Sequence, residues 1–373
     1  MIFIFDFFAK IQKNVNLFKH FLLVSSVLKF LYGFFINAFD MLKKLFLLFF
    51  FALTIGEIFA QDPQITQFDQ SVMYLNPAFT GTTGKFRYHG LQRLQWLAID
   101  SYYNTTIASF DFNAQKLRSG FGLSLMYDQA GSANINASNI GGYYSFFVPI
   151  RTWVLRLGLQ ANYVSRGADF SNKLVFPSQV LQNSAPVWEG KNGQSTSFWD
   201  FSTGLVIYNR NFWFGASLHH LSQPNQSIIG SSSALAMKIS AHVGANIEIK
   251  RSQGNLYILP SVLFKQQGAM SQLDISTRFG IENFPIIFGV SYRGLPILPS
   301  LKGLNQDALA GIVGFQMGNL YMGYSYDFTI SSLAPYSGGS HEITITYQHG
   351  SYPEDVICPL FFKGRKSHNF RRN

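Results

Sequence analysis

The histidines and one glycine-rich segment are the residues of this chain whose types could do chemistry. His219, His220 and His242 are candidate metal ligands, but neighbouring residues on a strand point to opposite faces, so His219 and His220 could not easily bind one ion. Gly81-Thr-Thr-Gly-Lys85 is rich in glycine, as phosphate-binding loops are, but its spacing does not fit a P-loop and no helical pattern follows. The motifs His-Glu-x-x-His and Gly-x-Ser-x-Gly do not occur. We therefore predict no catalytic residue, no metal ligand and no cofactor.

Charged residues at alternate positions of apolar segments form a further set. The set consists of Asp111, Asp128, Asp274, Asp327, Glu342, Arg156, Arg278 and Arg293. If these segments are strands of a barrel, the charges face its interior, where they need partners or water. We expect them to pair with one another rather than to line a substrate path.

The elements that would position these residues are strands. In Tyr321–Phe328, the side chains of Met322, Tyr324, Tyr326 and Phe328 would share one face, with more polar residues on the other. Period-two alternation of this kind is typical of a strand with one apolar and one polar face. Residues 272–282 alternate in the same way, and no helical period fits them.

The same alternation predicts about fourteen strands, an even number as in closed bacterial barrels. They lie near residues 85–97, 102–113, 119–128, 138–149, 153–164, 199–208, 211–219, 238–248, 254–265, 270–281, 284–293, 307–317, 319–328 and 341–348.

The connections and the composition favour an all-β fold, a transmembrane antiparallel β-barrel of the outer-membrane type, over residues 85–348. Turns after even-numbered strands are short, whereas loops after odd-numbered strands tend to be long, notably 165–198, 220–237, 294–306 and 329–340. In a soluble β-sandwich, the length of a loop is not expected to depend on whether it follows an odd-numbered or an even-numbered strand. Aromatic residues make up 16% and charged residues 13% of the chain, and the mean hydropathy is only +0.10. A lipid-facing wall around a polar lumen explains these values.

The start of the chain predicts export. Residues 41–60 combine a basic start, an apolar run and a small residue at Ala60, as in a secretory signal peptide. We interpret residues 1–40 as an over-extended gene start. Residues 61–84 show no sustained alternation and would line the periplasmic mouth, fold into the lumen or simply lead to the first strand. Short turns are periplasmic in such barrels, which predicts an outer-membrane location with both termini in the periplasm.

The C-terminal segment, residues 349–373, is a basic tail. The net charge of the whole chain is +10, but basic residues are scattered along the strands and turns and cluster only between Lys363 and Arg372. We therefore expect no nucleic-acid binding and interpret the tail as a solvated or partner-facing end. Cys358 is the single cysteine, which excludes a disulfide within the chain and any cysteine zinc site.

Short motifs along residues 61–348 resemble those of the PorP/SprF proteins. They lie in Gln61–Gly81, in Gln92–Trp96 and in Gly323–Glu342. The residues that carry the resemblance are Asn76, Pro77, Gly81, Gln95, Trp96, Tyr324, Tyr326, Asp327, His341 and Glu342. The chain departs from the family pattern in residues 1–40 and in the tail after Tyr352.

The resemblance implies an outer-membrane protein of the type IX secretion system of Bacteroidetes, linked to protein secretion and gliding motility. It also implies partners: a secreted surface protein or adhesin, bound through its C-terminal domain, and other components of the secretion system.

The long loops are where we expect such a partner to bind. Phe170, Phe176 and Trp188 in loop 165–198, and Tyr336 in loop 329–340, are aromatic side chains of the kind that dominate binding energy at interfaces. The alternative is that the loop 165–198 residues pack on the barrel mouth. A channel or transporter for small or hydrophobic solutes is the alternative function, because a barrel of this size can enclose a path.

Overall fold

The computed structural model describes residues 62–99, 102–131, 135–168, 194–228, 230, 232–252, 254–300, 303–331 and 334–350. The predicted signal peptide and gene start, the aromatic residues Phe170, Phe176 and Trp188, and nearly all of the basic tail with Cys358 lie outside these residues.

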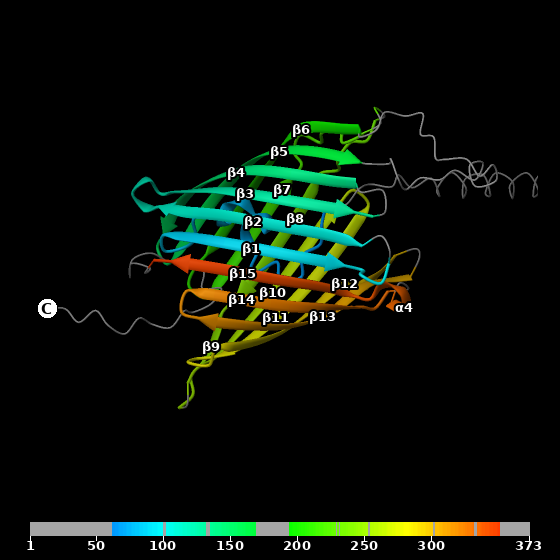
Figure 1. Ribbon diagram of the computed structural model, residues 1–373. Coiled ribbons are helices and arrows are strands. Elements are labelled where there is room, and N and C mark those ends of the chain that lie inside the picture. Colours follow the sequence, from blue (N-terminus) through cyan, green and yellow to red (C-terminus); the bar gives the residue numbers. More distant parts are fainter. Residues whose placement is uncertain are drawn as a thin grey trace, which may run out of the picture. The chain divides into compact units, whose positions relative to one another are not determined.

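The described residues form an antiparallel sheet (Figure 1). Its strands are β1 (Phe86–Gln95), β2 (Tyr103–Ala114), β3 (Ser119–Ala130), β4 (Ile135–Ile150), β5 (Trp153–Ala168), β6 (Gln194–Tyr208), β7 (Phe212–His219), β8 (Lys238–Ala245), β9 (Ile247–Ile249), β10 (Leu256–Gln267), β11 (Met270–Ile281), β12 (Ile286–Ser300), β13 (Gly303–Met317), β14 (Leu320–Thr329) and β15 (Ser340–His349). Short helices are α2 (Val72–Leu75), η1 (Pro77–Phe79), η2 (Gln115–Leu117) and α4 (Ala334–Ser337). Within the described part of the chain, no helix is long and apolar enough to cross a membrane.

The sheet closes on itself into a barrel. β1 pairs with β15, and β10 pairs with β11, so each strand has a neighbour on both sides. β8 and β9 pair with β10 in one continuous register and are a single strand interrupted at Asn246. The 15 strand segments therefore make 14 barrel strands, which confirms the predicted fold. Closure removes the open edges that would leave backbone groups unpaired in lipid.

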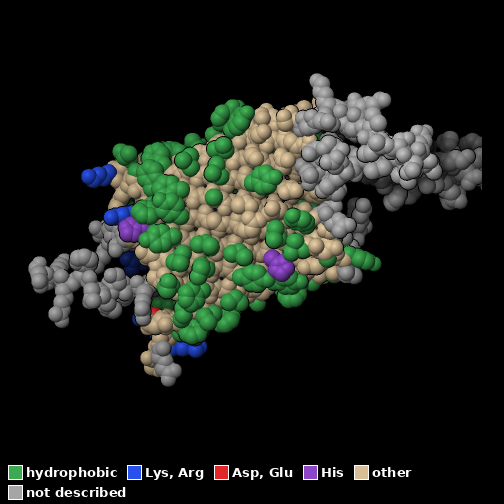
Figure 2. All heavy atoms as spheres, viewed as in Figure 1, with side chains coloured by type: hydrophobic (Ala, Val, Ile, Leu, Met, Phe, Trp, Pro, Cys, Tyr) green, Lys and Arg blue, Asp and Glu red, His purple; other side chains and the backbone are tan. Residues whose placement is uncertain are grey.

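The alternation in the sequence corresponds to an outer and an inner face. On β11, Ile275, Phe279 and Ile281 are exposed on the outside, while Asp274 and Arg278 are buried on the inside. Figure 2 shows hydrophobic side chains spread over the visible wall, with the Lys and Arg side chains of that view near the edge where the short turns lie. A lipid-facing outer wall of this kind is the pattern of outer-membrane barrels.

The predicted loop at 294–306 is wrong. β12 continues to Ser300 and β13 begins at Gly303, with register shifts between Arg293 and Gly294 and between Leu295 and Pro299. Glycine and two prolines break the alternation here without ending the strands, because the bulges absorb the residues that cannot pair. We call this end of the barrel, where β1 ends and β8 begins, the loop end, and the opposite end the turn end.

Candidate functional site

The N-terminal segment, residues 62–84, lies inside the barrel. Asp62 contacts residues at the loop end of β8 and β10 and the residue that follows β7. Thr80 and Gly81 contact residues at the turn end of β2, β4 and β5. The segment therefore crosses the lumen from the loop end to the turn end before β1 begins at Phe86. Nearly all of its side chains from Ile65 to Thr83 are buried.

Asp62 is held at the loop end by a group that we call the clasp. Its carboxylate contacts Lys238 Nζ and lies 3.0 Å from His220 Nε2. His220 Nδ1 lies 2.8 Å from Asp200 Oδ2. Burial alone would raise the pKa of Asp62, but Lys238 and His220 outweigh it and hold the pKa well below the usual range. Burial alone would lower the pKa of His220, but Asp62 and Asp200 outweigh it and raise the pKa to about 9.

The clasp predicts a dependence of stability on pH. Because the pKa of His220 rises from its ordinary 6.5 to about 9 in the folded barrel, its charge stabilises the fold fully below pH 6.5, and this contribution is lost as the pH passes 9. We expect the free energy of unfolding lost on His220→Gln to be about 3 kcal/mol larger near pH 6 than near pH 10. Urea unfolding of the wild type and of His220→Gln between these two pH values measures this difference. If the free energy lost on substitution does not depend on pH, His220 is not charged by its contacts with Asp62 and Asp200 as described.

A second ionic group, centred on Arg93, holds the next residues of the segment. Arg93 contacts Glu342 at 3.1 Å and Asp327 at 2.8 Å, and all three side chains are almost fully buried. The backbone N–H groups of Thr66 and Gln67 donate to Glu342 at 2.9 and 2.7 Å. The backbone of the segment is therefore hydrogen-bonded to a buried ionic group of the inner wall.

Further along the segment, ionic and polar contacts continue on both sides. Asp69 pairs with Arg278, and the Ser71 hydroxyl lies 2.9 Å from His89 Nε2. At the turn end, Gly81 N–H donates to Asp111 at 2.6 Å, and the guanidinium of Arg156 donates to the Thr80 carbonyl. Contacts therefore run along the whole length of the segment.

Asn76 marks the tightest part of the crossing. Its side-chain amide donates to the carbonyls of Leu205 at 3.2 Å and Ala216 at 2.9 Å, and its Oδ1 accepts from Ala78 N–H at 2.9 Å. The wall opposite has glycine: a Cβ on Gly204 would lie 1.9 Å from Asn76 Oδ1. The segment fits here because the wall has no side chain at that position.

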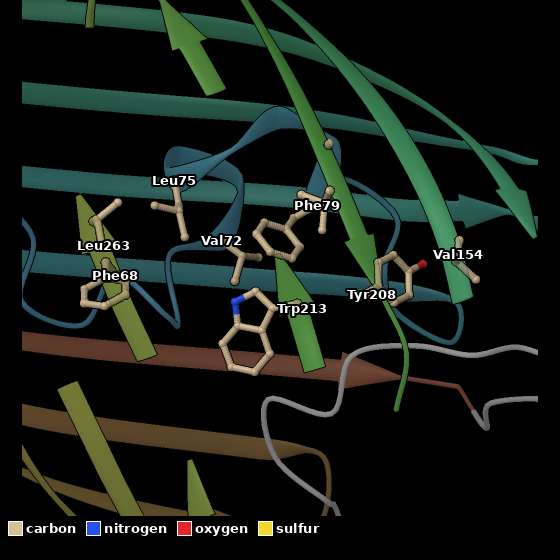
Figure 3. Packing of buried hydrophobic residues seen from close by; sticks show 10 residues of the cluster. Phe68, Val72, Leu75, Phe79, Val154, Tyr208, Trp213 and Leu263 are labelled. Atoms are coloured by element: carbon tan, nitrogen blue, oxygen red, sulfur yellow. The ribbon is translucent and has the colours of Figure 1, made fainter. Parts of the chain in front are cut away.

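Apolar side chains of the segment pack on the inner wall beside Asn76. Figure 3 shows Phe79 close to Trp213, with Val72 and Leu75 in the same cluster. The cluster also contains Phe68, Ala78, Val154, Val206, Tyr208 and Leu263. The main buried apolar cluster is therefore inside the lumen, between the segment and the wall.

The residues singled out by the family motifs fall in distinct places. Asn76, Pro77 and Gly81 belong to the segment, and Asp327 and Glu342 belong to the ionic group around Arg93. Tyr324, Tyr326 and His341 cluster instead on the outer wall near the loop end, where Tyr324 Oη lies 2.8 Å from His341 Nδ1 and the Tyr326 and His341 rings meet edge to face. β1 ends at Gln95 at the loop end and Trp96 follows it, while Tyr336 is highly exposed on α4.

Most of the predicted inward charges have ionic partners, but only Asp327 and Arg293 pair with each other within the predicted set. Asp128 accepts a hydrogen bond from the Thr105 hydroxyl instead. Asp111 binds Arg87, Asp274 binds Lys265, and Asp327 binds both Arg93 and Arg293. The predicted set lacks Arg87, Arg93 and Lys265, although each lies at an inward position of its strand. No sequence pattern indicates that Asp69 and the Thr80 carbonyl of the segment bind Arg278 and Arg156.

The two adjacent histidines do not point to opposite faces as predicted. His219 is buried and lies 3.1 Å from Ser217, and His220 turns back to reach Asp62. The reason is that β7 ends at His219, and His220 adopts a left-handed backbone conformation with φ 60°. Among the described residues, no group of three or more His, Cys, Asp or Glu side chains could hold a metal ion.

The two ends of the described chain do not lie together. Asp62 is at the loop end, whereas His349 ends β15 at the turn end, beside Phe86. The prediction that both termini lie on the short-turn side therefore does not hold for Asp62, the first described residue.

Comparisons with known proteins concern both the family and the fold. The family model described as type IX secretion system membrane protein PorP/SprF matches residues 57–347. The outer membrane protein Omp33 of Acinetobacter baumannii shares 8% identity, with 72% of this chain and 100% of that chain covered and a TM-score of 0.40. A FadL homologue of Pseudomonas aeruginosa shares 11% identity, with 75% and 94% covered and a TM-score of 0.39. No curated protein matches the chain.

Proposed function

Because the chain belongs to the PorP/SprF family of type IX secretion system membrane proteins, we propose that it is a non-enzymatic outer-membrane barrel that binds secreted surface proteins and retains them at the cell surface. The observation that carries this proposal is the filled lumen. Residues 62–84 contact the inner wall from the loop end to the turn end, through ionic groups and an apolar cluster. A barrel filled in this way is suited to holding a partner rather than to passing solutes.

The partner binds at the loop end in this proposal. The short turns face the periplasm, as is usual for outer-membrane barrels, so the loop end faces the cell exterior. Tyr336 on α4 is 71% exposed there and is an aromatic contact of the kind that partners recognise. Phe170, Phe176 and Trp188 of the loop between β5 and β6 are further candidates on sequence grounds. In this proposal, the partner element is the C-terminal domain of the secreted protein, as the resemblance to the family implies.

Other components of the secretion system would meet the barrel from the opposite side. The turn end carries Lys116, Arg118 and Arg210, which are exposed. Basic turns offer contacts to acidic surfaces of periplasmic components.

A channel for small or hydrophobic solutes is the second candidate function. It would require residues 62–84 to move, because they lie across the lumen. The extent of these contacts favours the binding function over the channel.

A pull-down from outer membranes in mild detergent tests the proposed function. We expect a large secreted protein to be recovered with the tagged barrel through its C-terminal domain. Tyr336→Ser should reduce the recovery by about tenfold or more if Tyr336 is an interface hot spot. Tyr88→Ser, on the outer wall of β1, is the matched control and should leave the recovery unchanged. Recovery of the wild-type barrel alone, together with channel activity in a planar bilayer, would favour the transporter instead.

A further inference from the structure

A cavity of about 250 Å³ lies at the loop end of the lumen, between the N-terminal segment and the ends of the strands. We call it the loop-end cavity. Its lining includes residues from Asp62 to Leu75 on one side, and residues of β1, β8, β10, β11, β12 and β13 on the others. The same segment separates it from a smaller cavity of about 80 Å³ against β1 to β7. The loop-end cavity is therefore a distinct space with the segment as one wall.

The lining combines apolar side chains with carboxamides and serine hydroxyls. Ile65, Phe68 and Leu263 supply a buried apolar surface. Gln95 and Gln306, from β1 and β13, line the same space. A carboxamide both donates and accepts hydrogen bonds, so it can pair with the N–H and the C=O of a peptide group. The buried apolar part of the lining offers no hydrogen-bond donor and therefore suits a hydrocarbon or aromatic side chain.

The charges at the cavity already have partners. Lys238 binds Asp62, and Lys265 binds Asp274. Asp307, the remaining carboxylate of the lining, binds Arg293 at 2.8 Å. A charged ligand would lose its water here without gaining a free counter-charge, so the cavity favours an uncharged one.

Trp96 is the aromatic residue of the lining whose backbone conformation is unfavourable. Its φ is 63°, in the left-handed region that is unfavourable for a bulky residue. Its N–H donates to the Gly339 carbonyl at 2.8 Å, which fixes this conformation, and Trp96 lines the loop-end cavity. Backbone strain of this kind persists where the surrounding structure holds it and is concentrated at binding sites.

We propose that the loop-end cavity binds a short, uncharged, extended peptide segment that inserts one large apolar side chain. The carboxamides pair with the peptide backbone, while the apolar surface and the Trp96 ring accommodate the side chain. This inference rests on the proposed function for the source of the segment, which is the secreted partner protein. The chemistry of the recognition rests on the cavity alone.

Titration calorimetry of the purified barrel with capped peptides tests the inference. The probes are acetyl-Gly-Thr-Phe-Thr-Gly-amide and the same peptide with Ser or Lys in place of Phe. We expect the Phe peptide to bind about tenfold or more tighter than either of the others. Equal binding of the three peptides, or displacement of the Phe peptide by a neutral oligosaccharide at comparable concentration, would overturn the inference.

Variants locate the binding. Gln306→Trp fills the cavity and should weaken binding of the Phe peptide by about tenfold, whereas Leu309→Trp, on the outer wall of the same strand, should not change it. Trp96→Gly removes the ring, and glycine tolerates its backbone conformation, so binding should weaken while the barrel stays folded. Unchanged binding in both Gln306→Trp and Trp96→Gly would overturn the inference.

The two proposals can fail separately. If the Phe peptide binds as expected but the pull-down recovers no secreted protein, the loop-end cavity stands and the retention function falls. If a secreted protein is recovered and the cavity variants bind it as the wild type does, the function stands and the inference falls.

Discussion

Replacing Arg93 with Met should destabilise the barrel by about 3–5 kcal/mol. Arg93 is buried and contacts two buried carboxylates, Glu342 and Asp327. Without the guanidinium, Arg293 still pairs with Asp327, but Glu342 keeps only the N–H groups of Thr66 and Gln67. A buried carboxylate that has lost its counter-charge is the source of the penalty. Urea unfolding in detergent micelles, followed by tryptophan fluorescence, measures the change.

Two further variants show whether the effect arises from the unpaired charge. Arg210→Met removes an arginine from an exposed turn and should change stability by no more than about 0.5 kcal/mol. Adding Glu342→Gln to Arg93→Met removes the orphaned charge and should recover part of the loss. An Arg93→Met barrel as stable as the wild type would contradict the ionic group as described.

Replacing Gly158 with Ala should displace the N-terminal segment from the wall at a cost of about 2–3 kcal/mol, because overpacking a filled interior forces neighbouring groups to move. A Cβ on Gly158 would lie 2.2 Å from Ala78 N and 2.3 Å from the carbonyl carbon of Pro77. These are backbone atoms, so no side-chain rotation can relieve the contact. Thermal unfolding and the rate of proteolysis within residues 62–84 are the measurements.

The matched control is Gly311→Ala on β13. A Cβ at Gly311 has no heavy atom within 4 Å, so this variant should be neutral or slightly stabilising. If Gly158→Ala and Gly311→Ala behave alike in both measurements, the segment does not pack against β5 as the structure has it.

The strands could be predicted because the period of two is imposed by the backbone itself. Each strand separates lipid from lumen, so inward positions favour polar residues and outward positions favour apolar residues, as Asp274 and Ile275 illustrate. The prediction failed where Gly294 and two prolines interrupt the alternation. At that point, bulges keep β12 and β13 paired, but the sequence no longer alternates between polar and apolar residues.

The sequence could not decide among the three positions considered for the N-terminal segment, of which one was the lumen, because the position depends on partners far along the chain. Thr66 and Gln67 are held by Glu342, and Asn76 by Leu205 and Ala216, whereas α2 and η1 are too short to show a period. One residue does indicate that another part of the chain enters the lumen. Arg156 is an inward arginine for which the neighbouring strands provide no carboxylate within ion-pair distance, so it needs an acceptor from elsewhere. That acceptor is the Thr80 carbonyl of the segment.

The central claim is that residues 62–84 fill the lumen, and conductance in planar bilayers tests it most directly. The proteins to compare are the mature barrel and a variant that lacks residues 62–79, each shown to be folded by its heat-modifiable mobility in gels. If residues 62–84 fill the lumen, the barrel that retains them should be silent and the variant should form stable open channels. A mature barrel that conducts as well as the variant would contradict it.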